Sequence, residues 1–153
     1  MRSRIVLDAN ILILLCVGEV NVRDVAKHRK LSQYTPRHFR LATEFVGSFE
    51  RRATTSHCLS QASDALEKDP RHLEMLLYLT STYVESHFAI ELIRSAQTFL
   101  ELGVADAGLI MASKRGVVLT SDGPLYAAIT AIGRRAYHFW SLEEQVLSEQ
   151  GTY

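Results

Sequence analysis

The chain has 153 residues, 47% of them hydrophobic, and its formal net charge is zero. This length and composition predict one compact domain over residues 1–153, and the neutral bulk charge indicates neither a nucleic-acid nor a membrane partner. No segment approaches the ~20 consecutive apolar residues of a membrane-spanning helix, so we expect no membrane partner.

Charge is unevenly distributed along this neutral chain. Residues 1–52 hold ten Lys and Arg against five Asp and Glu, whereas residues 53–153 hold seven against twelve. The basic surplus is concentrated in one early segment, which holds Arg23, Lys27, Arg29, Lys30, Arg37 and Arg40. This segment predicts a phosphate-binding face beside an acidic site, and an ordinary solvated helical face gives the same pattern. Tyr34 and Phe39 within it are candidates for stacking on bases.

The two cysteines indicate a reducing environment. Cys16 and Cys58 both lie in apolar helical context and lack the CxxC spacing of a redox or zinc motif. We therefore expect two buried free thiols and a cytoplasmic location.

The first half of the chain predicts two strands and several helices. The β-branched run at residues 4–8 predicts the first strand, and residues 53–55 predict a second short one. Helices are predicted at residues 10–17, where Gly18 ends the helix, at 21–30, from Thr35-Pro36 onward, at 56–66 with Ser56 as the cap, and from Asp69-Pro70 onward. In the last of these helices we expect four leucines to be buried, namely Leu73, Leu76, Leu77 and Leu79.

The second half continues the alternation. Helices are predicted at residues 91–102, closed by Gly103, at 104–114, at 125–132, stopped by Gly133, and at 141–150, where Ser141 is the cap and Glu144 completes a capping box. Residues 117–120 and 136–140 predict strands. Because strands and helices alternate, we expect an α/β fold, namely a three-layer α/β/α arrangement around a mostly parallel central sheet.

Three aspartates sit at the ends of these elements. Asp8 ends the first strand, Asp122 follows the strand at 117–120, and Asp106 begins an apolar helix. Since ligands bind at the carboxyl ends of parallel strands, we expect the three carboxylates to converge. At ~5 Å and an effective dielectric near 20, each pair repels by roughly 3 kcal/mol, which a bound cation relieves. All-oxygen sites of this kind are typical of Mg2+ or Mn2+, while each aspartate taken alone is also a common helix cap.

The motifs around these aspartates resemble those of the PIN-domain nucleases, including the VapC-like toxins of toxin–antitoxin pairs. The matching segments follow the family's order and spacing across essentially the whole chain, and they are Leu7-Asp8-Ala9-Asn10, Val104-Ala105-Asp106-Ala107 and Thr120-Ser121-Asp122. The resemblance implies a PIN-like fold, with Asp8, Asp106 and Asp122 as catalytic metal ligands and Mg2+ or Mn2+ as the cofactor. It also implies an RNA substrate, an antitoxin-like protein partner and a homodimer.

One acid of the family is missing from this chain. The family places a fourth acid, a glutamate, on the helix after the second strand, and Gln61 occupies the matching position. Asp64 shares a helix face with Gln61 and is the first candidate for the missing catalytic carboxylate, ahead of Glu50 and then Glu44. Gln61 itself can hydrogen-bond a water in the site. Either a substitute completes the site, or its activity is weakened or lost.

Polar groups near the acids complete the expected site. We expect Asn10, Thr120 and Ser121 to fix carboxylate rotamers or to touch phosphate, although turn and cap positions also favour these residue types. Lys30 and Arg37 are the expected phosphate-binding cations.

These residues lead to one functional hypothesis and two rivals. We expect a metal-dependent phosphodiesterase, most specifically an endoribonuclease of the toxin–antitoxin type. Gln61 favours the first rival, a catalytically silent PIN domain that serves as a binding or scaffold module. The second rival is a receiver-like signalling domain, which needs an acidic pair after the first strand and a lysine at a late strand end. Asn10 and Phe139-Trp140 do not supply these groups.

Overall fold

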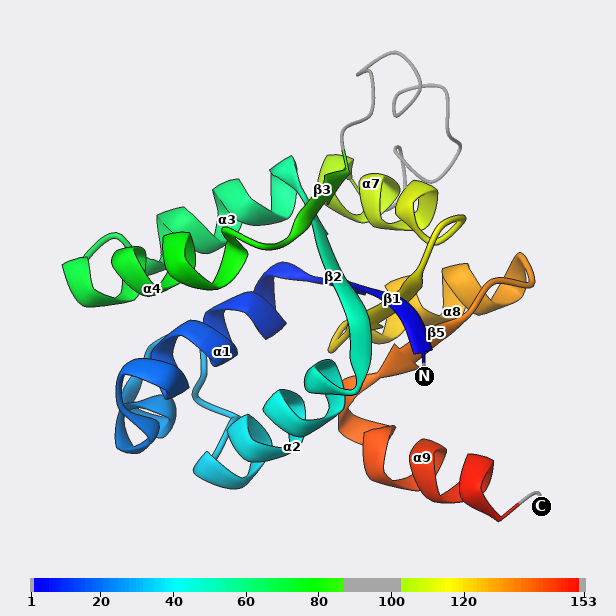
Figure 1. The fold of residues 1–153 in the computed structure, drawn as a ribbon, viewed down its shortest axis with the longest axis horizontal. Coiled ribbons are helices and arrows are strands. Elements are labelled where there is room, and N and C mark those ends of the chain that lie inside the picture. Colours follow the sequence, from blue (N-terminus) through cyan, green and yellow to red (C-terminus); the bar gives the residue numbers. More distant parts are fainter. Residues whose placement is uncertain (1, 87–102, 152–153) are drawn as a thin grey trace.

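The computed structural model describes residues 2–86 and 103–151, and its core is a parallel β-sheet flanked by helices (Figure 1). The strands are β1 (Arg2–Leu7), β2 (Phe49–Thr55), β3 (Val84–Ser86), β4 (Val117–Thr120) and β5 (Ala136–His138). They pair in the order β3-β2-β1-β4-β5, and every pairing is parallel. The expected α/β fold with a mostly parallel central sheet is therefore confirmed.

Helices cover the sheet from both sides. They are α1 (Ala9–Val20), α2 (Pro36–Gly47), α3 (Ser56–Leu66), α4 (Pro70–Thr80), α7 (Val104–Ala112), α8 (Gly123–Ala131) and α9 (Leu142–Gln150), with 3-10 turns η1 (Val22–Lys27) and η2 (Phe139–Ser141). In Figure 1, α1 to α4 lie to one side of the strands, and α7 and α8 lie to the other. Within residues 2–86 and 103–151, no helix is long and apolar enough to cross a membrane.

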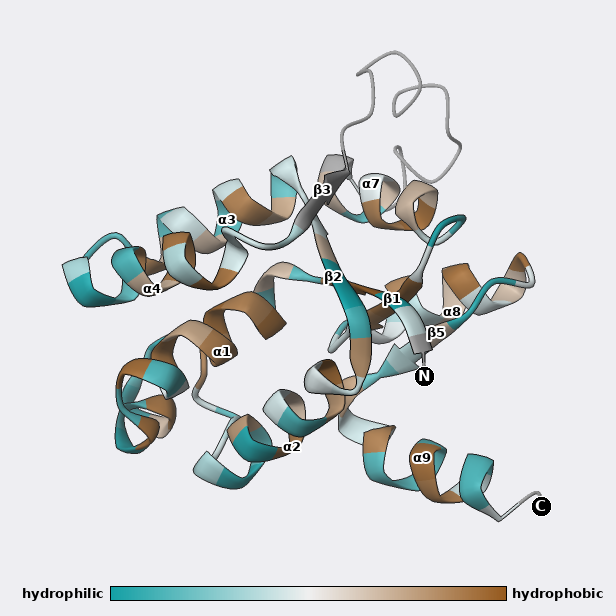
Figure 2. Cartoon of the chain, in the orientation of Figure 1, coloured by the Kyte–Doolittle hydropathy of each residue, from teal (hydrophilic) through white to brown (hydrophobic). Residues whose placement is uncertain are grey.

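Helix α1 is the centre of the core, because it contacts α2, α3, α4 and β4. Figure 2 shows it as almost uniformly hydrophobic, and every residue from Ile11 to Gly18 is buried. The helix continues through Gly18 to Val20, so the predicted end at Gly18 is wrong. The reason is packing: a Cβ atom at Gly18 would lie 2.1 Å from Cδ2 of Phe39, so glycine makes room for a ring of α2. The Phe39 ring therefore packs against the core.

Several predicted elements agree with the structure, and others differ for identifiable reasons. The starts of α2 after Thr35 and of α4 after Asp69 are confirmed, as is β4. The segment predicted as a helix at 21–30 forms only the 3-10 turn η1, and β3 was not predicted because it has three residues. The predicted strand at 136–140 divides into β5 and η2. The helix predicted at 91–102 lies outside the described residues.

Helix caps and burial differ from expectation in three places. Thr55 rather than Ser56 caps α3, because the Cys58 amide donates to the Thr55 hydroxyl. Ser141 precedes α9 as expected, but its side chain makes no capping hydrogen bond. Leu77 is 74% exposed, whereas its neighbour Leu76 is buried, so the apolar face of α4 is narrower than the run of leucines predicts.

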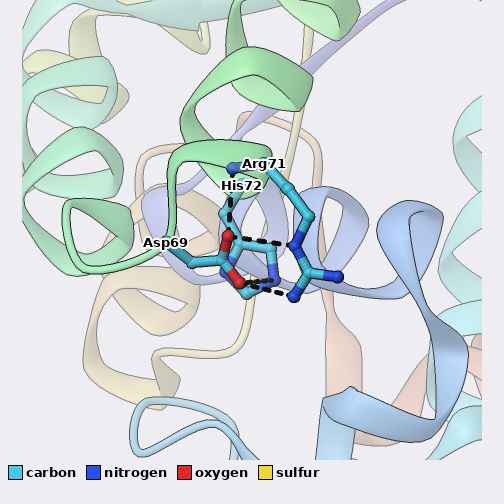
Figure 3. A network of polar contacts seen from close by, with 3 residues as sticks. All are labelled: Asp69, Arg71 and His72. Atoms are coloured by element: carbon cyan, nitrogen blue, oxygen red, sulfur yellow. Dashed lines mark hydrogen bonds and ion pairs between the residues drawn. The ribbon is translucent and has the colours of Figure 1, made fainter.

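The start of α4 carries a compact polar cluster (Figure 3). The Asp69 carboxylate accepts hydrogen bonds from the Arg71 amide at 3.0 Å and from the Arg71 guanidinium at 2.7 and 3.1 Å, and it lies 3.8 Å from Nε2 of His72. Arg71 holds the pKa of Asp69 at about 2. Asp69 is thus an aspartate whose hydrogen bonds are local, with its charge balanced by a neighbour two residues away.

Replacing Gly18 tests the packing of α1 on α2. An Ala in the middle of a helix normally stabilises it by ~0.5–1 kcal/mol relative to Gly. We expect Gly18→Ala instead to lower the free energy of unfolding by about 1–3 kcal/mol, because the Phe39 ring must move. Urea denaturation measures the difference.

Gly47→Ala is the matched control, since among the described residues no atom outside its own helix backbone and chain neighbours lies within 4 Å of a Cβ built there, at the end of α2. This control should be at least as stable as the parent protein, and Phe39→Leu should restore part of the stability of Gly18→Ala. Equal stability of the two alanine variants would show that Phe39 does not occupy this place.

Candidate active site

An acidic pocket lies at the carboxyl ends of β1 and β4. The sheet order makes these two strands neighbours, although the chain leaves β1 toward β2 and leaves β4 toward β5. Such a reversal of strand order is where ligands bind in open α/β sheets. The pocket has a volume of about 440 Å³ and is lined by Asp8, Ala9, Asn10, Ile13, Arg29, Lys30, Gln61, Asp64, Ala65, Asp106 and Asp122. All three predicted aspartates therefore face one pocket.

Asp8 is the most firmly held of the three aspartates. It is only 8% exposed, and both of its carboxylate oxygens accept hydrogen bonds. The Ala9 amide donates to Oδ1 at 2.6 Å, and the Thr120 hydroxyl donates to Oδ2 at 2.6 Å. The Asp8 amide itself donates to the carbonyl of Leu119 at 3.1 Å. Asp8 is consequently both the cap of α1 and a carboxylate of fixed orientation in the pocket.

Asp122 and Asp106 differ in how they are held. Asp122 caps α8, because its Oδ1 accepts from the Leu125 amide at 3.0 Å, and its own amide donates to the Thr120 hydroxyl at 3.0 Å. Asp106 lies in the first turn of α7, where Gly103 is the cap, and its carboxylate makes no hydrogen bond to the residues described. Helix capping therefore explains Asp8 and Asp122 in part, and does not explain Asp106.

The carboxylates destabilise one another's charge. Burial, followed by the charges of Asp122 and Asp8, raises the pKa of Asp106 to about 6. Burial also raises the pKa of Asp8, even though the bonds from Thr120 and Ala9 act in the opposite direction. Asp69, with Arg71 against it, shows the reverse shift. The acidic pocket therefore holds negative charge that its neighbours balance only partly.

The donor set suits a hard cation, although it is not a complete cage. Among the described residues, no group of three or more His, Cys, Asp or Glu side chains is arranged to hold a metal ion by itself. Mg2+ is commonly bound by one or two carboxylates, with waters and substrate phosphates as its other ligands. The raised pKa values of Asp8 and Asp106 fit a site whose negative charge a cation would relieve, and Asp8, Asp106 and Asp122 are the oxygen donors that would hold it.

The pocket also separates the proposed substitutes for the missing glutamate. Gln61 and Asp64 both line it, so the first-ranked candidate, Asp64, is in place. Glu44 instead lines a groove between α2 and α9. Glu50 lies near the start of β2, beside Phe49, which pairs with Arg2, so it is at the opposite end of the sheet from Asp8. The structure does not bring either glutamate to the acidic pocket.

Only some of the predicted basic and polar residues line the acidic pocket. Lys30 lines the acidic pocket together with Arg29, which the sequence placed only within a basic segment. Arg37 lies elsewhere and is paired with Glu143. Thr120 is fully buried and holds Asp8, so it positions a carboxylate and does not reach a substrate.

Asn10 lines the pocket, and Ser121 and Cys58 lie next to it without lining it. The Asn10 amide donates to the Ser121 hydroxyl at 3.4 Å, which links the start of α1 to the end of β4. Cys58 was not predicted as a site residue, yet its thiol lies 4.0 Å from Oδ1 of Asp8. Burial and the charge of Asp8 raise the pKa of Cys58 to about 12, so it is a protonated, weak donor. Its place three residues after Thr55, at the start of α3, is the only sequence signal for it.

Comparisons with protein-family models and with curated proteins give no match for this chain.

Replacing Asp106 tests the electrostatics of the pocket without disturbing a helix cap. A carboxyl whose pKa rises from 3.8 to about 6 on folding binds more protons in the folded state, so stability is lost as pH rises through that interval. In the absence of divalent cations, we expect Asp106→Asn to remove this loss. The variant should gain on the order of 1 kcal/mol at pH 7, after allowing for solvent screening of a half-buried group. Thermal melts from pH 4 to pH 8 in chelator measure it.

Asp69→Asn is the control of opposite sign. Because the pKa of Asp69 is lowered, its charge stabilises the fold at neutral pH, and its removal should lower the melting temperature there. If Asp106→Asn were also less stable at pH 7, its carboxylate would be serving the start of α7 rather than repelling Asp8 and Asp122.

Proposed function

We propose that this protein is a metal-dependent phosphodiesterase that cleaves RNA. The observation that carries the proposal is the convergence of Asp8, Asp106 and Asp122 in one pocket that also holds Arg29 and Lys30. Carboxylates that can hold a metal ion and basic side chains that can bind phosphate are the groups that a metal-dependent phosphodiesterase uses. RNA is preferred to DNA because the PIN-domain nucleases, which the motifs resemble, mostly cut RNA.

Each residue has a role that follows from its surroundings. Bound Mg2+ or Mn2+ would supply charge relief at the phosphate and a more acidic water. Asp8, whose rotamer is fixed by Thr120, would hold the cation together with Asp106 and Asp122. Asp64 and Gln61 would orient the attacking water from α3. Arg29 and Lys30 are exposed at the rim, where they would bind phosphates of the RNA backbone.

One observation favours a second candidate function, a silent PIN-like domain that serves as a binding or scaffold module. Gln61 lines the acidic pocket where the family has a glutamate, so the pocket has one carboxylate fewer. Such a module would retain Arg29 and Lys30 for binding RNA, and would neither bind divalent cations at millimolar concentration nor cleave.

The resemblance extends the proposal beyond the pocket. By analogy with VapC-like toxins, we propose an endoribonuclease toxin that forms a homodimer and is held inactive by an antitoxin-like protein. Cys16 and Cys58 are free and buried, which is compatible with the reducing cytoplasm as its location.

Cleavage of single-stranded RNA across a titration of Mg2+ and Mn2+ tests the enzyme proposal. We expect the parent protein to cleave, and Asp106→Asn to lose about 10²-fold or more in rate, because a ligand carboxylate is removed. Calorimetric titration with Mn2+ should show weaker binding by the same variant. If the parent protein neither cuts RNA nor binds either cation near millimolar concentration, the scaffold replaces the enzyme.

Two substitutions on α3 decide which residue replaces the family glutamate. If Asp64 is the substitute, Asp64→Ala should abolish cleavage and Gln61→Glu should change it little. If the position is vacant, Gln61→Glu should raise activity at low Mg2+, because it restores a carboxylate. Glu67→Ala is the matched control, since Glu67 is exposed, follows α3 directly and does not line the pocket. A loss of activity in this control would point to an effect on α3 itself.

A further inference from the structure

A second, smaller pocket lies between the start of α2 and the start of α9. Its volume is about 180 Å³, and it is lined by Arg37, His38, Leu41, Phe139, Trp140, Ser141, Glu143 and Glu144. We propose that this aromatic pocket binds a nucleobase of single-stranded RNA by stacking on Trp140. The choice of RNA rests on the proposed function, because the neighbouring acidic pocket would take the phosphodiester.

Trp140 is the first observation. It is 40% exposed, whereas the adjacent Phe139 is buried in the core, so η2 presents one aromatic ring to solvent and one to the interior. The buried Tyr34 ring packs against the Trp140 ring and fixes its orientation, with ring centroids 4.7 Å apart. An exposed aromatic ring whose orientation is already fixed is a stacking surface that loses little entropy on binding. Stacking on such rings is how proteins bind unpaired bases.

His38 forms a second wall of the pocket. Its ring is perpendicular to that of Trp140, with centroids 5.2 Å apart. The Thr35 amide donates to Nδ1 of His38 at 3.0 Å, so this nitrogen carries no proton. Burial and the charge of Arg37 lower the pKa of His38, and Glu143 acts in the opposite direction. His38 therefore offers an uncharged ring at neutral pH, which suits the edge of a base.

The rim of the pocket offers polar groups that a nucleotide can use. Arg37 and Glu143 form an ion pair in which both side chains are largely exposed. Because exposed ion pairs contribute only ~0–1 kcal/mol, a phosphate can draw Arg37 away from Glu143 at small cost. Glu144 adds a second carboxylate that can accept hydrogen bonds from base amino groups.

Tyr34 connects the aromatic pocket to the acidic pocket. It is 4% exposed and contacts Trp140 on one side. Burial raises the pKa of Tyr34, the Ser121 hydroxyl lowers it and the charge of Asp8 raises it, so the phenol end of this ring faces the carboxylates. Ser121 in turn accepts from Asn10, which lines the acidic pocket. One tyrosine thus separates the surface for a base from the site for a phosphodiester.

The fluorescence of Trp140 reports the proposed contact directly, since it is the only tryptophan of the chain. We expect single-stranded RNA to quench this fluorescence saturably in the presence of chelator, where no cleavage is possible. An abasic oligonucleotide of the same length should bind through its phosphates and leave the fluorescence nearly unchanged. Equal quenching by the abasic strand, or no quenching by RNA, would overturn the proposal.

Three variants, followed by the anisotropy of fluorescently labelled RNA, give a second measurement. We expect Trp140→Leu to weaken binding about tenfold, and Trp140→Phe to retain most of it, because a ring remains for stacking. Leu147→Ala is the control, since Leu147 is a large exposed apolar side chain of α9 outside the aromatic pocket. If Trp140→Leu bound RNA as tightly as this control, the proposal would fail.

The outcome is separable from that of the proposed enzyme. Quenching by RNA without cleavage at any metal concentration would support the base site and remove the nuclease. RNA cleavage without any change in Trp140 fluorescence would support the nuclease and overturn the base site. A Trp140 signal that depends on protein concentration and not on RNA would assign this surface to self-association, and would also overturn the proposal.

Discussion

The Asp8 carboxylate accepts hydrogen bonds of 2.6 Å from the Thr120 hydroxyl and from the Ala9 amide, and so ties β4 and the start of α1 to the end of β1. The Asp8 amide completes the link by donating to Leu119. The same Thr120 hydroxyl accepts from the Asp122 amide. The hydrogen bonds around Asp8 therefore both hold the strands and helix together and form part of the candidate site. The Thr120 side chain bonds to both Asp8 and Asp122, and so sets their relative position.

This arrangement has an electrostatic consequence for the folded chain. A buried carboxylate with hydrogen bonds but no ion pair is costly to keep charged, and a second one nearby increases the cost. Asp106 stands where both effects add, without a hydrogen bond from the described residues to offset them. The three aspartates consequently carry different shares of structure and function. Asp8 and Asp122 hold helices as well as facing the pocket, whereas Asp106 has no such local role.

The sequence predicted the parallel sheet and the convergence of the aspartates because both depend on local signals. Apolar runs that end in Asp8 or precede Asp122 place these residues at strand ends, and parallel topology brings strand ends together. Features that depend on contacts between residues far apart in the sequence could not be predicted. Gly18 looks like a helix end until the Phe39 ring beside it is known. Two other outcomes likewise depend on how η1, α2 and η2 pack together. Arg37 and Lys30 line different pockets, and Tyr34 is buried against Trp140.

Gln61 is better understood from the charge of the whole acidic pocket than from its own position. The described residues that line the pocket include four aspartates, Asp8, Asp64, Asp106 and Asp122, against the two cations Arg29 and Lys30. With every group ionised, the excess is two negative charges, which one divalent cation offsets. A glutamate at position 61 would add a third negative charge. It would thereby increase the repulsion that contributes to the raised pKa of Asp106. Within the proposed function, glutamine at this position therefore favours a site that holds one divalent cation. That cation offsets two of the four negative charges, and Arg29 and Lys30 offset the other two.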